Sequence, residues 1–339
     1  MVNPMSNHNR ATRLAWLLII ISLVFWQGCA GIRPLPEETP LTVYEIGETG
    51  AVPDEQVRRW APAFVTYGHA EPHNRIGQPV ARRTGGGNEA IEINPDQPAI
   101  FFMQRDFVTD KGRYHNLIYR VHFPAIPYSL IPFNLTAGSN VGLMVVVTLN
   151  QRQEPVLVTT VHTCGCYLAI IPTDHLPESS LPEGWQARPM DVYGETLTPQ
   201  LNYRSVEQPR VLVHLRPDLH RVMKLEVVPS DRLRGSRYAS IPMRPLPIAA
   251  LLKLPYGQET TSFYYDEGFL RGHVKGSVKL FETLLMSAIS LDFFVGTDKI
   301  YGDPEVYGNH FYTSLKPWRR SDSDMWDFAR FLEYWGWRL

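Results

Sequence analysis

The chain has 339 residues, of which 44% are hydrophobic and 12% aromatic, and this composition excludes an intrinsically disordered protein. Its 33 basic and 34 acidic residues nearly cancel, so the charge gives no basis for binding nucleic acid or an anionic membrane surface. The three cysteines are too few for a disulfide scaffold, and the fold must therefore be held by a hydrophobic core.

The N-terminal segment carries Arg10 and Arg13 and no acidic residue, and an apolar run follows over residues 14–26. This run is too short to span a bilayer as a helix and is typical of the hydrophobic region of a secretory signal peptide. Gly28 and Cys29 come next. The region resembles the cleavage box of bacterial lipoproteins, in which a small residue precedes a cysteine that is lipidated and becomes the new N-terminus.

The resemblance implies that residues 1–28 are a signal peptide and that a lipid on Cys29 tethers the rest of the chain to a membrane. The alternative is an uncleaved N-terminal anchor, because Trp26 and Gln27 differ from the usual leucine and small residue. In both cases the remaining chain faces the outside of the cytoplasmic membrane. Ala30 stands where aspartate would favour retention in the inner membrane. We therefore expect a protein of the bacterial cell envelope, anchored in the outer membrane and facing the periplasm.

Residues 29–97 are expected to be the lipidated tether and an irregular entry segment. The prolines of its first half predict an extended, stiffened linker. The glycine triplet at residues 85–87 predicts a flexible loop, because no strand precedes it and no phosphate-binding GKS or GKT sequence follows. This part of the sequence thus predicts a spacer between the membrane and the folded domain.

Residues 98–240 form the predicted β-rich core, in which short runs of Val, Ile, Leu and aromatic residues alternate with Pro, Gly and Asn. The predicted strands are residues 99–108, 116–123, 142–149, 155–171, 210–215 and 221–228. Residues 143–147 and 156–158 are apolar on both faces, as expected at the centre of a sandwich. The proline-rich residues 172–209 predict a long excursion that serves either as a binding surface or as plain decoration.

Residues 241–339 begin with a proline-rich connection, which separates the β-rich core from a helical, aromatic-rich C-terminal region. Apolar residues at helical spacing predict a helix over residues 274–289, with Lys275, Lys279 and Glu282 on its polar face. A final helix is predicted from Met325 to Trp335. The fold class that follows is α+β, an antiparallel sandwich-like β region with a helical C-terminal region packed on it.

Four of the eight tryptophans lie in the last 22 residues, at positions 318, 326, 335 and 337. Such a concentration forms either an aromatic binding cleft or a tail helix that closes the core. The second interpretation predicts that Trp326 and Trp335 are buried.

The sequence Val161-His162-Thr163-Cys164-Gly165-Cys166-Tyr167 is the main candidate site. On an extended strand His162, Cys164 and Cys166 point to one face, because side chains alternate. Alternate Cα atoms lie about 6.6 Å apart, so the three residues can share one metal ion only if Gly165 bends the chain. The same bend would allow a disulfide between Cys164 and Cys166, which the oxidising compartment favours.

Three interpretations of this stretch remain open. The first is a site for a transition metal such as zinc. It would need further ligands from neighbouring strands, and His122 and His214 are the best candidates. A Cys164–Cys166 disulfide is the second interpretation. In the third, two buried thiols pack as small hydrophobic residues.

No motif in the chain fixes a reaction, and the sequence contains no GxSxG nucleophile elbow. The favoured function is therefore a non-catalytic envelope lipoprotein that binds a ligand or an envelope protein partner. The alternative is an exported metal-dependent or thiol redox enzyme centred on His162, Cys164 and Cys166.

Overall fold

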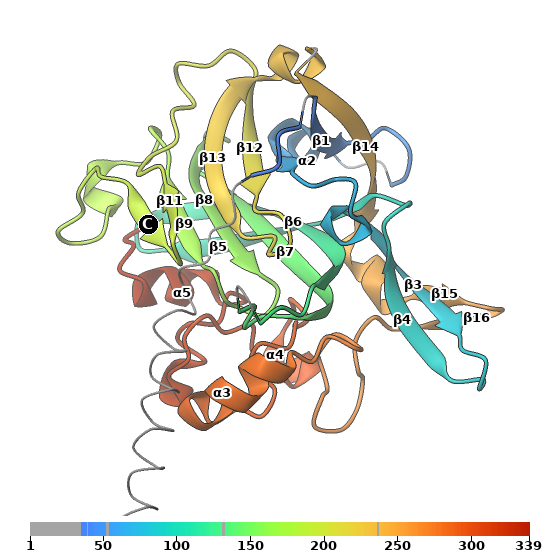
Figure 1. The fold of residues 1–339 in the computed structure, drawn as a ribbon. Coiled ribbons are helices and arrows are strands. Elements are labelled where there is room, and N and C mark those ends of the chain that lie inside the picture. The colour runs from blue at the N-terminus through green and yellow to red at the C-terminus, as the bar shows by residue number, and fades with distance from the viewer. Residues whose placement is uncertain (1–34, 39, 52–53, 131–132, 236) are drawn as a thin grey trace, which may run out of the picture.

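The computed structural model describes residues 35–339 except 39, 52–53, 131–132 and 236, so the predicted signal peptide and Cys29 lie outside the described residues. A mixed ten-stranded sheet dominates the structure (Figure 1). Its strands are β1 (Leu41–Ile46), β2 (Ala63–Thr66), β5 (Ala99–Thr109), β6 (Gly112–Ile126), β7 (Gly138–Leu149), β8 (Pro155–His162), β9 (Ala169–Pro172), β12 (Pro209–Leu215), β13 (Val222–Pro229) and β14 (Tyr238–Pro247). Their spatial order is β13-β12-β2-β1-β14-β5-β6-β7-β8-β9.

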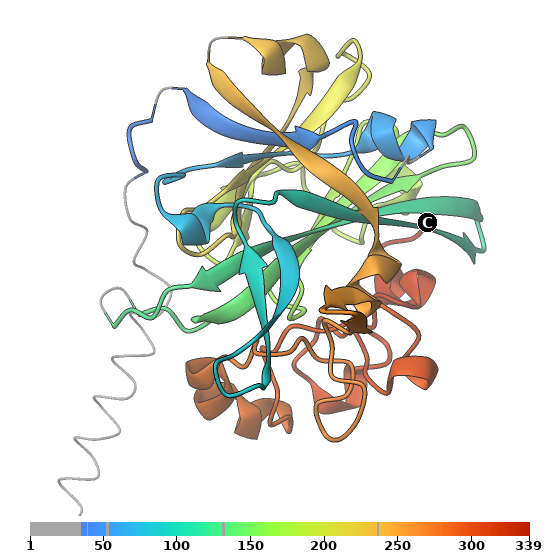
Figure 2. The same cartoon turned by 90° about the vertical axis from the view of Figure 1, so that its right-hand side faces the viewer.

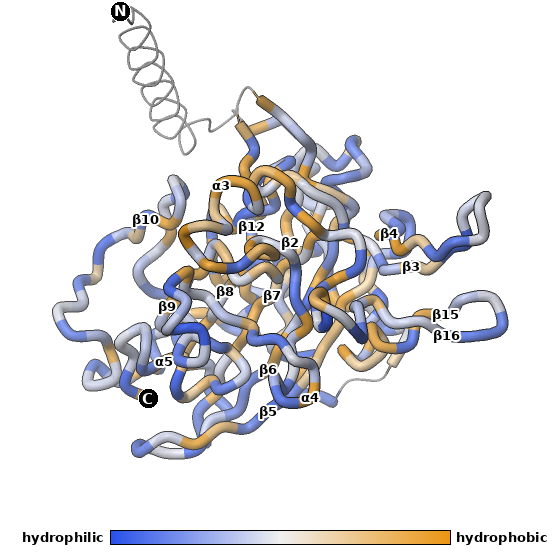
Figure 3. The backbone as a smooth tube through the Cα atoms, turned by 90° about the horizontal axis from the view of Figure 1, so that it is seen from below, coloured by the Kyte–Doolittle hydropathy of each residue, from blue (hydrophilic) through white to orange (hydrophobic). Residues whose placement is uncertain are grey.

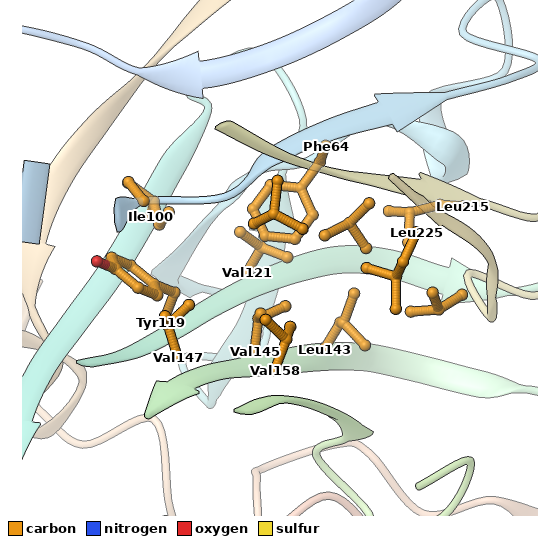
Figure 4. Close-up of a cluster of buried hydrophobic side chains, with 14 of the residues drawn as sticks. Phe64, Ile100, Tyr119, Val121, Leu143, Val145, Val147, Val158, Leu215 and Leu225 are labelled. Carbon is orange, nitrogen blue, oxygen red and sulfur yellow. The ribbon is translucent and has the colours of Figure 1, made fainter. Parts of the chain in front are cut away.

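The sheet curls so that its two halves enclose the main core. Strands β5 to β9 form an antiparallel meander, whereas β14 pairs in parallel with both β1 and β5. Phe64 from β2 and Leu215 from β12 face Val121, Val145 and Val158 from the meander (Figure 4). Burial of this inner face of the sheet is the main source of stability in this half of the molecule.

The outer face of the meander is covered by the C-terminal region (Figure 2). Met144 and Val146 of β7 pack here against Phe311, Phe331 and other C-terminal residues. The helices of this region are α3 (Leu280–Ser290), α4 (Pro304–Tyr307) and α5 (Phe328–Tyr334). Strand β7 is therefore buried on both faces, which confirms the prediction from its continuous apolar run.

Shorter elements decorate the sheet. Helix α2 (Glu55–Trp60) packs beside β12, and three two-stranded ribbons lie outside the sheet. The ribbons are β3 (Gln78–Arg83) with β4 (Glu89–Asn94), β10 (Met190–Val192) with β11 (Glu195–Leu197), and β15 (Leu254–Tyr256) with β16 (Glu259–Thr261). The first and third ribbons project from the same side of the molecule (Figure 1). Within the described residues, no helix is both long and apolar enough to cross a bilayer.

The predicted α+β class is confirmed, and the six predicted runs all contain strands of the sheet. The strands predicted within residues 98–240 pair with one another in antiparallel fashion, and the parallel pairings that make the sheet mixed all involve β1, β2 or β14. One detail was wrong, because the run at residues 155–171 is interrupted after His162 and resumes as β9 at Ala169.

Residues 41–94, expected to be irregular, contribute β1 to β4 and α2. Strand β14 was also missed, because its prolines argue against a central strand. The structure accommodates them by using their carbonyl oxygens. Pro245 accepts a hydrogen bond from the Ala51 N–H (2.9 Å), while the neighbouring Arg244 donates its own N–H to the Pro98 oxygen (2.9 Å).

The predicted polar face of the first C-terminal helix was wrong. Lys279 and Glu282 are buried, whereas Leu284 and Ile289 are more than 60% exposed. The α3 segment is largely hydrophobic (Figure 3), so periodicity alone could not tell which side it turns inward. Lys279 forms a buried ion pair with Asp298, as described below.

The aromatic tail closes the core through residues other than those predicted. Trp337 is buried, Trp326 is partly buried, and Trp335 is 39% exposed. Phe328 and Phe331 of α5 are buried in the same cluster as Met144 and Val146 of the sheet. The helix ends at Tyr334, so the chain no longer follows helical spacing when it reaches the last two tryptophans.

Candidate functional site

The candidate site lies where β8 ends at His162 and the chain turns through residues 163–166. The His162 N–H donates to the Cys166 oxygen (2.9 Å), and the Gly165 N–H donates to the His162 oxygen (2.8 Å). Gly165 has a φ of +93°, and a Cβ there would lie 2.0 Å from the Tyr312 carbonyl oxygen. This position requires glycine, because a side chain would meet both backbone strain and a direct clash.

This turn brings His162, Cys164 and Cys166 together. The two cysteines form a disulfide with their Cα atoms 5.6 Å apart, and the potential ligand atoms of the three residues all lie within 4.8 Å of one another. Cys164 is buried and Cys166 is half-buried. Because the disulfide uses both sulfur atoms, thiolates become available for nucleophilic or metal chemistry only after reduction.

His162 is held through one of its two ring nitrogens. Nε2 donates to the His220 carbonyl oxygen (3.1 Å), so Nδ1 of the neutral ring carries the lone pair. Nδ1 is buried and has no hydrogen-bond partner among the described residues. Burial, followed by the positive charges of Lys279 and Arg221, lowers the pKa of His162 to about 3, so the ring is neutral at physiological pH.

His122 and His214, predicted as further metal ligands, do not join this group. His122 is on the opposite face of the sheet, where its ring packs against Phe101 and Phe263. Cross-strand pairing explains this, because His122 is opposite Gly142 whereas His162 is opposite Leu143, and adjacent positions point to opposite faces.

His214 lies in the other half of the sheet. Its ring hydrogen-bonds the Tyr67 hydroxyl (3.1 Å) and the Glu226 carboxylate (2.9 Å). Two partners already occupy both of its nitrogens. The three-residue group at the β8 turn therefore stands without the two histidines that the sequence suggested.

A cavity of about 210 Å³ opens over the disulfide. Its walls come from separate parts of the chain, including the loop before β7, the β8 turn, the loop before β13 and helix α3. The Tyr167 and Tyr193 rings meet edge to face with centroids 4.9 Å apart, and the Arg221 guanidinium lies 5.6 Å from the centre of the Tyr167 ring. Glu282 and Met286 from α3 complete the opposite wall.

A buried ion pair lies behind the pocket. Lys279 Nζ is 3.1 Å from Asp298 Oδ2, and both side chains are fully buried. Oδ1 of Asp298 accepts hydrogen bonds from the Gly142 N–H (3.3 Å) and from the Thr163 hydroxyl. The pair thereby ties the start of α3 to the residue that follows His162.

A second buried lysine supports the disulfide loop. Lys299 Nζ donates to the Cys164 oxygen (2.8 Å) and to the Thr297 oxygen (3.2 Å). Burial lowers the pKa of Lys299 to about 8. Nearby, burial raises the pKa of Glu282, which favours its neutral form in the pocket wall.

Sequence reasoning missed the roles of Arg221, Lys279, Asp298 and Lys299 in this site. These residues lie far from His162 in the chain, and a single lysine or arginine carries no local sign that it will be buried. One signal was available, since Asp298 and Lys299 are adjacent charged residues within a short segment that is otherwise apolar or small. Charged residues in such surroundings are buried only when they are paired.

No protein-family model, curated protein or solved structure matches the chain. The chemistry of the pocket and of the disulfide loop is therefore the basis for a function.

Proposed function

We propose that the protein is a lipid-anchored lipoprotein of the bacterial cell envelope, held in the outer membrane, that binds a small ligand in the pocket over the Cys164–Cys166 disulfide. The leader and the Gly28-Cys29 box support the anchor. The role is binding rather than catalysis. The pocket combines apolar and aromatic walls with a few polar groups, the usual composition of a ligand site.

The pocket is the single observation that carries this proposal. Its cavity of about 210 Å³ is below the roughly 300–1,000 Å³ of pockets that enclose drug-sized molecules, which favours a small ligand or one side chain of a partner protein. Tyr167 and Tyr193 offer ring surfaces, and Arg221 lies beside them with its guanidinium already bonded to the Glu195 carboxylate (3.3 Å) and the Tyr193 oxygen (2.8 Å). A small planar group that packs against these rings fits the pocket best.

The proposal is tested by native mass spectrometry of the full chain, purified in detergent from the cell envelope of the bacteria that produce it. We expect a bound small molecule on the wild-type chain. Met286→Trp fills the pocket from α3 and should remove that molecule. Leu284→Trp adds the same ring to the exposed side of the same helix, so it should leave the bound molecule in place.

A wild-type chain that carries no small molecule, or equal binding by both tryptophan variants, would contradict the proposed ligand site. If the wild-type chain instead carries a bound envelope protein, and Met286→Trp loses that protein while Leu284→Trp retains it, the ligand is a side chain of the partner protein.

A thiol redox enzyme is the second candidate, and the position of the disulfide on the pocket wall favours it. Equilibration of the chain in glutathione buffers, followed by thiol labelling, measures its reduction potential. A potential below about −300 mV is typical of a structural disulfide, whereas a redox enzyme requires a higher value. The result separates the two functions, because the binding function does not require reduction.

A further inference from the structure

We propose that the reduced form of the β8 turn binds a single Cu(I) ion through Nδ1 of His162 and the sulfur atoms of Cys164 and Cys166. The inference rests on the proposed function, since it places a metal ion in the wall of the pocket that is proposed as a ligand site. It assigns a second kind of ligand to that pocket.

The orientation of His162 is the first support. A metal-binding histidine usually donates one ring N–H to a carbonyl or carboxylate, which fixes the tautomer and presents the other nitrogen to the metal. His162 has this arrangement, because Nε2 donates to the His220 oxygen and Nδ1 is left without a partner. The His220 residue that supplies this carbonyl is itself held in position, because its ring stacks on Phe123 and donates a hydrogen bond to the His73 oxygen (2.9 Å).

A buried nitrogen without a hydrogen bond is costly and calls for an explanation. The 2% exposure of His162 leaves little access for bulk water. A bound metal ion would satisfy Nδ1 directly. His122 Nδ1 and His220 Nδ1 are also buried without a partner, but among the described residues neither histidine belongs to a group of potential metal ligands, and both rings pack against phenylalanine side chains.

The spacing of the three ligand atoms is the second support. They lie within 4.8 Å of one another in the oxidised chain. Three ligands at about 2.0–2.3 Å from a trigonal ion stand about 3.5–4 Å apart, so small rotations of the side chains would complete the site. Sulfur and imidazole ligands select Cu(I) and zinc among the common ions.

The number of ligands favours Cu(I). Zinc needs a fourth ligand to complete its tetrahedron, which is a water molecule where the protein supplies three, whereas Cu(I) is satisfied by three ligands. The group at the β8 turn supplies three, and both further histidines suggested by the sequence point elsewhere. Two thiolates and Cu(I) carry one net negative charge, and Lys299, hydrogen-bonded to the Cys164 oxygen, lies close enough to offset it.

Reduction must precede binding. A dithiol donor would pass two electrons and two protons to the Cys164–Cys166 disulfide and would itself be oxidised to a disulfide. Cu(I) then displaces the two thiol protons and forms two Cu–S bonds and one Cu–N bond. The half-buried Cys166 and the open pocket provide the route by which the donor and the ion enter.

The test uses the full chain in detergent, reduced with dithiothreitol, desalted without oxygen and titrated with Cu(I) against a chromophoric Cu(I) chelator. We expect one copper per reduced chain and none per oxidised chain. X-ray absorption of the copper complex should show two sulfur neighbours and one nitrogen neighbour.

Variants then assign the ligands. His162→Gln should weaken binding at least tenfold and remove the nitrogen neighbour from the spectrum. His273→Gln replaces another buried histidine outside this group and should bind as the wild type does. Comparison of the reduced and oxidised wild-type chains needs no variant, so a folding defect cannot obscure the result.

Three outcomes would overturn the inference: no copper on the reduced chain, unchanged affinity in His162→Gln, or tighter binding of Zn(II) than of Cu(I). Its failure is distinct from failure of the proposed function. If the reduced chain takes no copper while Met286→Trp still removes the small molecule, only the copper site is wrong.

Discussion

The buried Lys279–Asp298 ion pair makes the sharpest prediction about stability. Both side chains are fully buried, and the pair joins α3 to the turn that carries the candidate site. Lys279→Met leaves the Asp298 carboxylate with hydrogen bonds from Gly142 and Thr163 but without its countercharge. Loss of one partner from a buried pair costs about 3–5 kcal/mol, because the remaining charge stays desolvated.

Urea denaturation followed by tryptophan fluorescence measures this cost. Arg82→Met is the matched control, since the Arg82–Glu92 pair has similar separation (2.7 Å) but exposed side chains, and it should change the unfolding free energy by at most about 1 kcal/mol. The double variant Lys279→Met, Asp298→Asn removes both charges and should recover most of the loss. A Lys279→Met chain within about 1 kcal/mol of the wild type would refute this account of the pair.

Three other predictions follow from the site, the core and the leader. Gly165→Ala should lower the unfolding free energy by about 1–3 kcal/mol in the same urea assay, because of the positive φ and the clash with Tyr312, whereas Gly86→Ala, which has open space around its Cβ, should be nearly neutral. Burial lowers the pKa of His273 to about 4, below its value of about 6.5 in the unfolded chain, so the unfolding free energy is highest above pH 6.5 and falls as the pH drops toward 4. At pH 5 this residue should lower the unfolding free energy by about 2 kcal/mol. A His273→Gln chain with the same pH dependence as the wild type would contradict this prediction. Cys29→Ala should abolish labelling by an alkyne fatty acid while Cys166→Ala retains it, and equal labelling of the two variants would exclude lipidation at Cys29.

The meander of the sheet could be predicted from the sequence, because its strands bury hydrophobic residues continuously and are bounded by turn residues. Strand β7 is the clearest case, since Val145 faces one core and Met144 the other. Strand β14 could not be predicted in the same way. Its prolines are tolerated only because their carbonyl oxygens and the N–H groups of neighbouring residues supply the cross-strand bonds, and that arrangement depends on distant strands.

In the candidate site, too, the local features could be predicted from the sequence and the long-range contacts could not. The His162-Thr163-Cys164-Gly165-Cys166 sequence indicated a local group that depended on a bend at Gly165, and the structure has that bend. The long-range partners were beyond sequence reasoning. Lys279 was assigned to an exposed face because the apolar residues of α3 were expected to face the core. In the structure several of these apolar residues face solvent, so hydrophobic periodicity could not identify the buried side of the helix.

The central claim is that the pocket over the Cys164–Cys166 disulfide holds a ligand. A crystal structure of the full chain, purified from the envelope in which it was made, tests this most directly. The account predicts a non-protein molecule or a partner's side chain in contact with Tyr167 and Met286. A pocket filled only by water in that structure would contradict the claim.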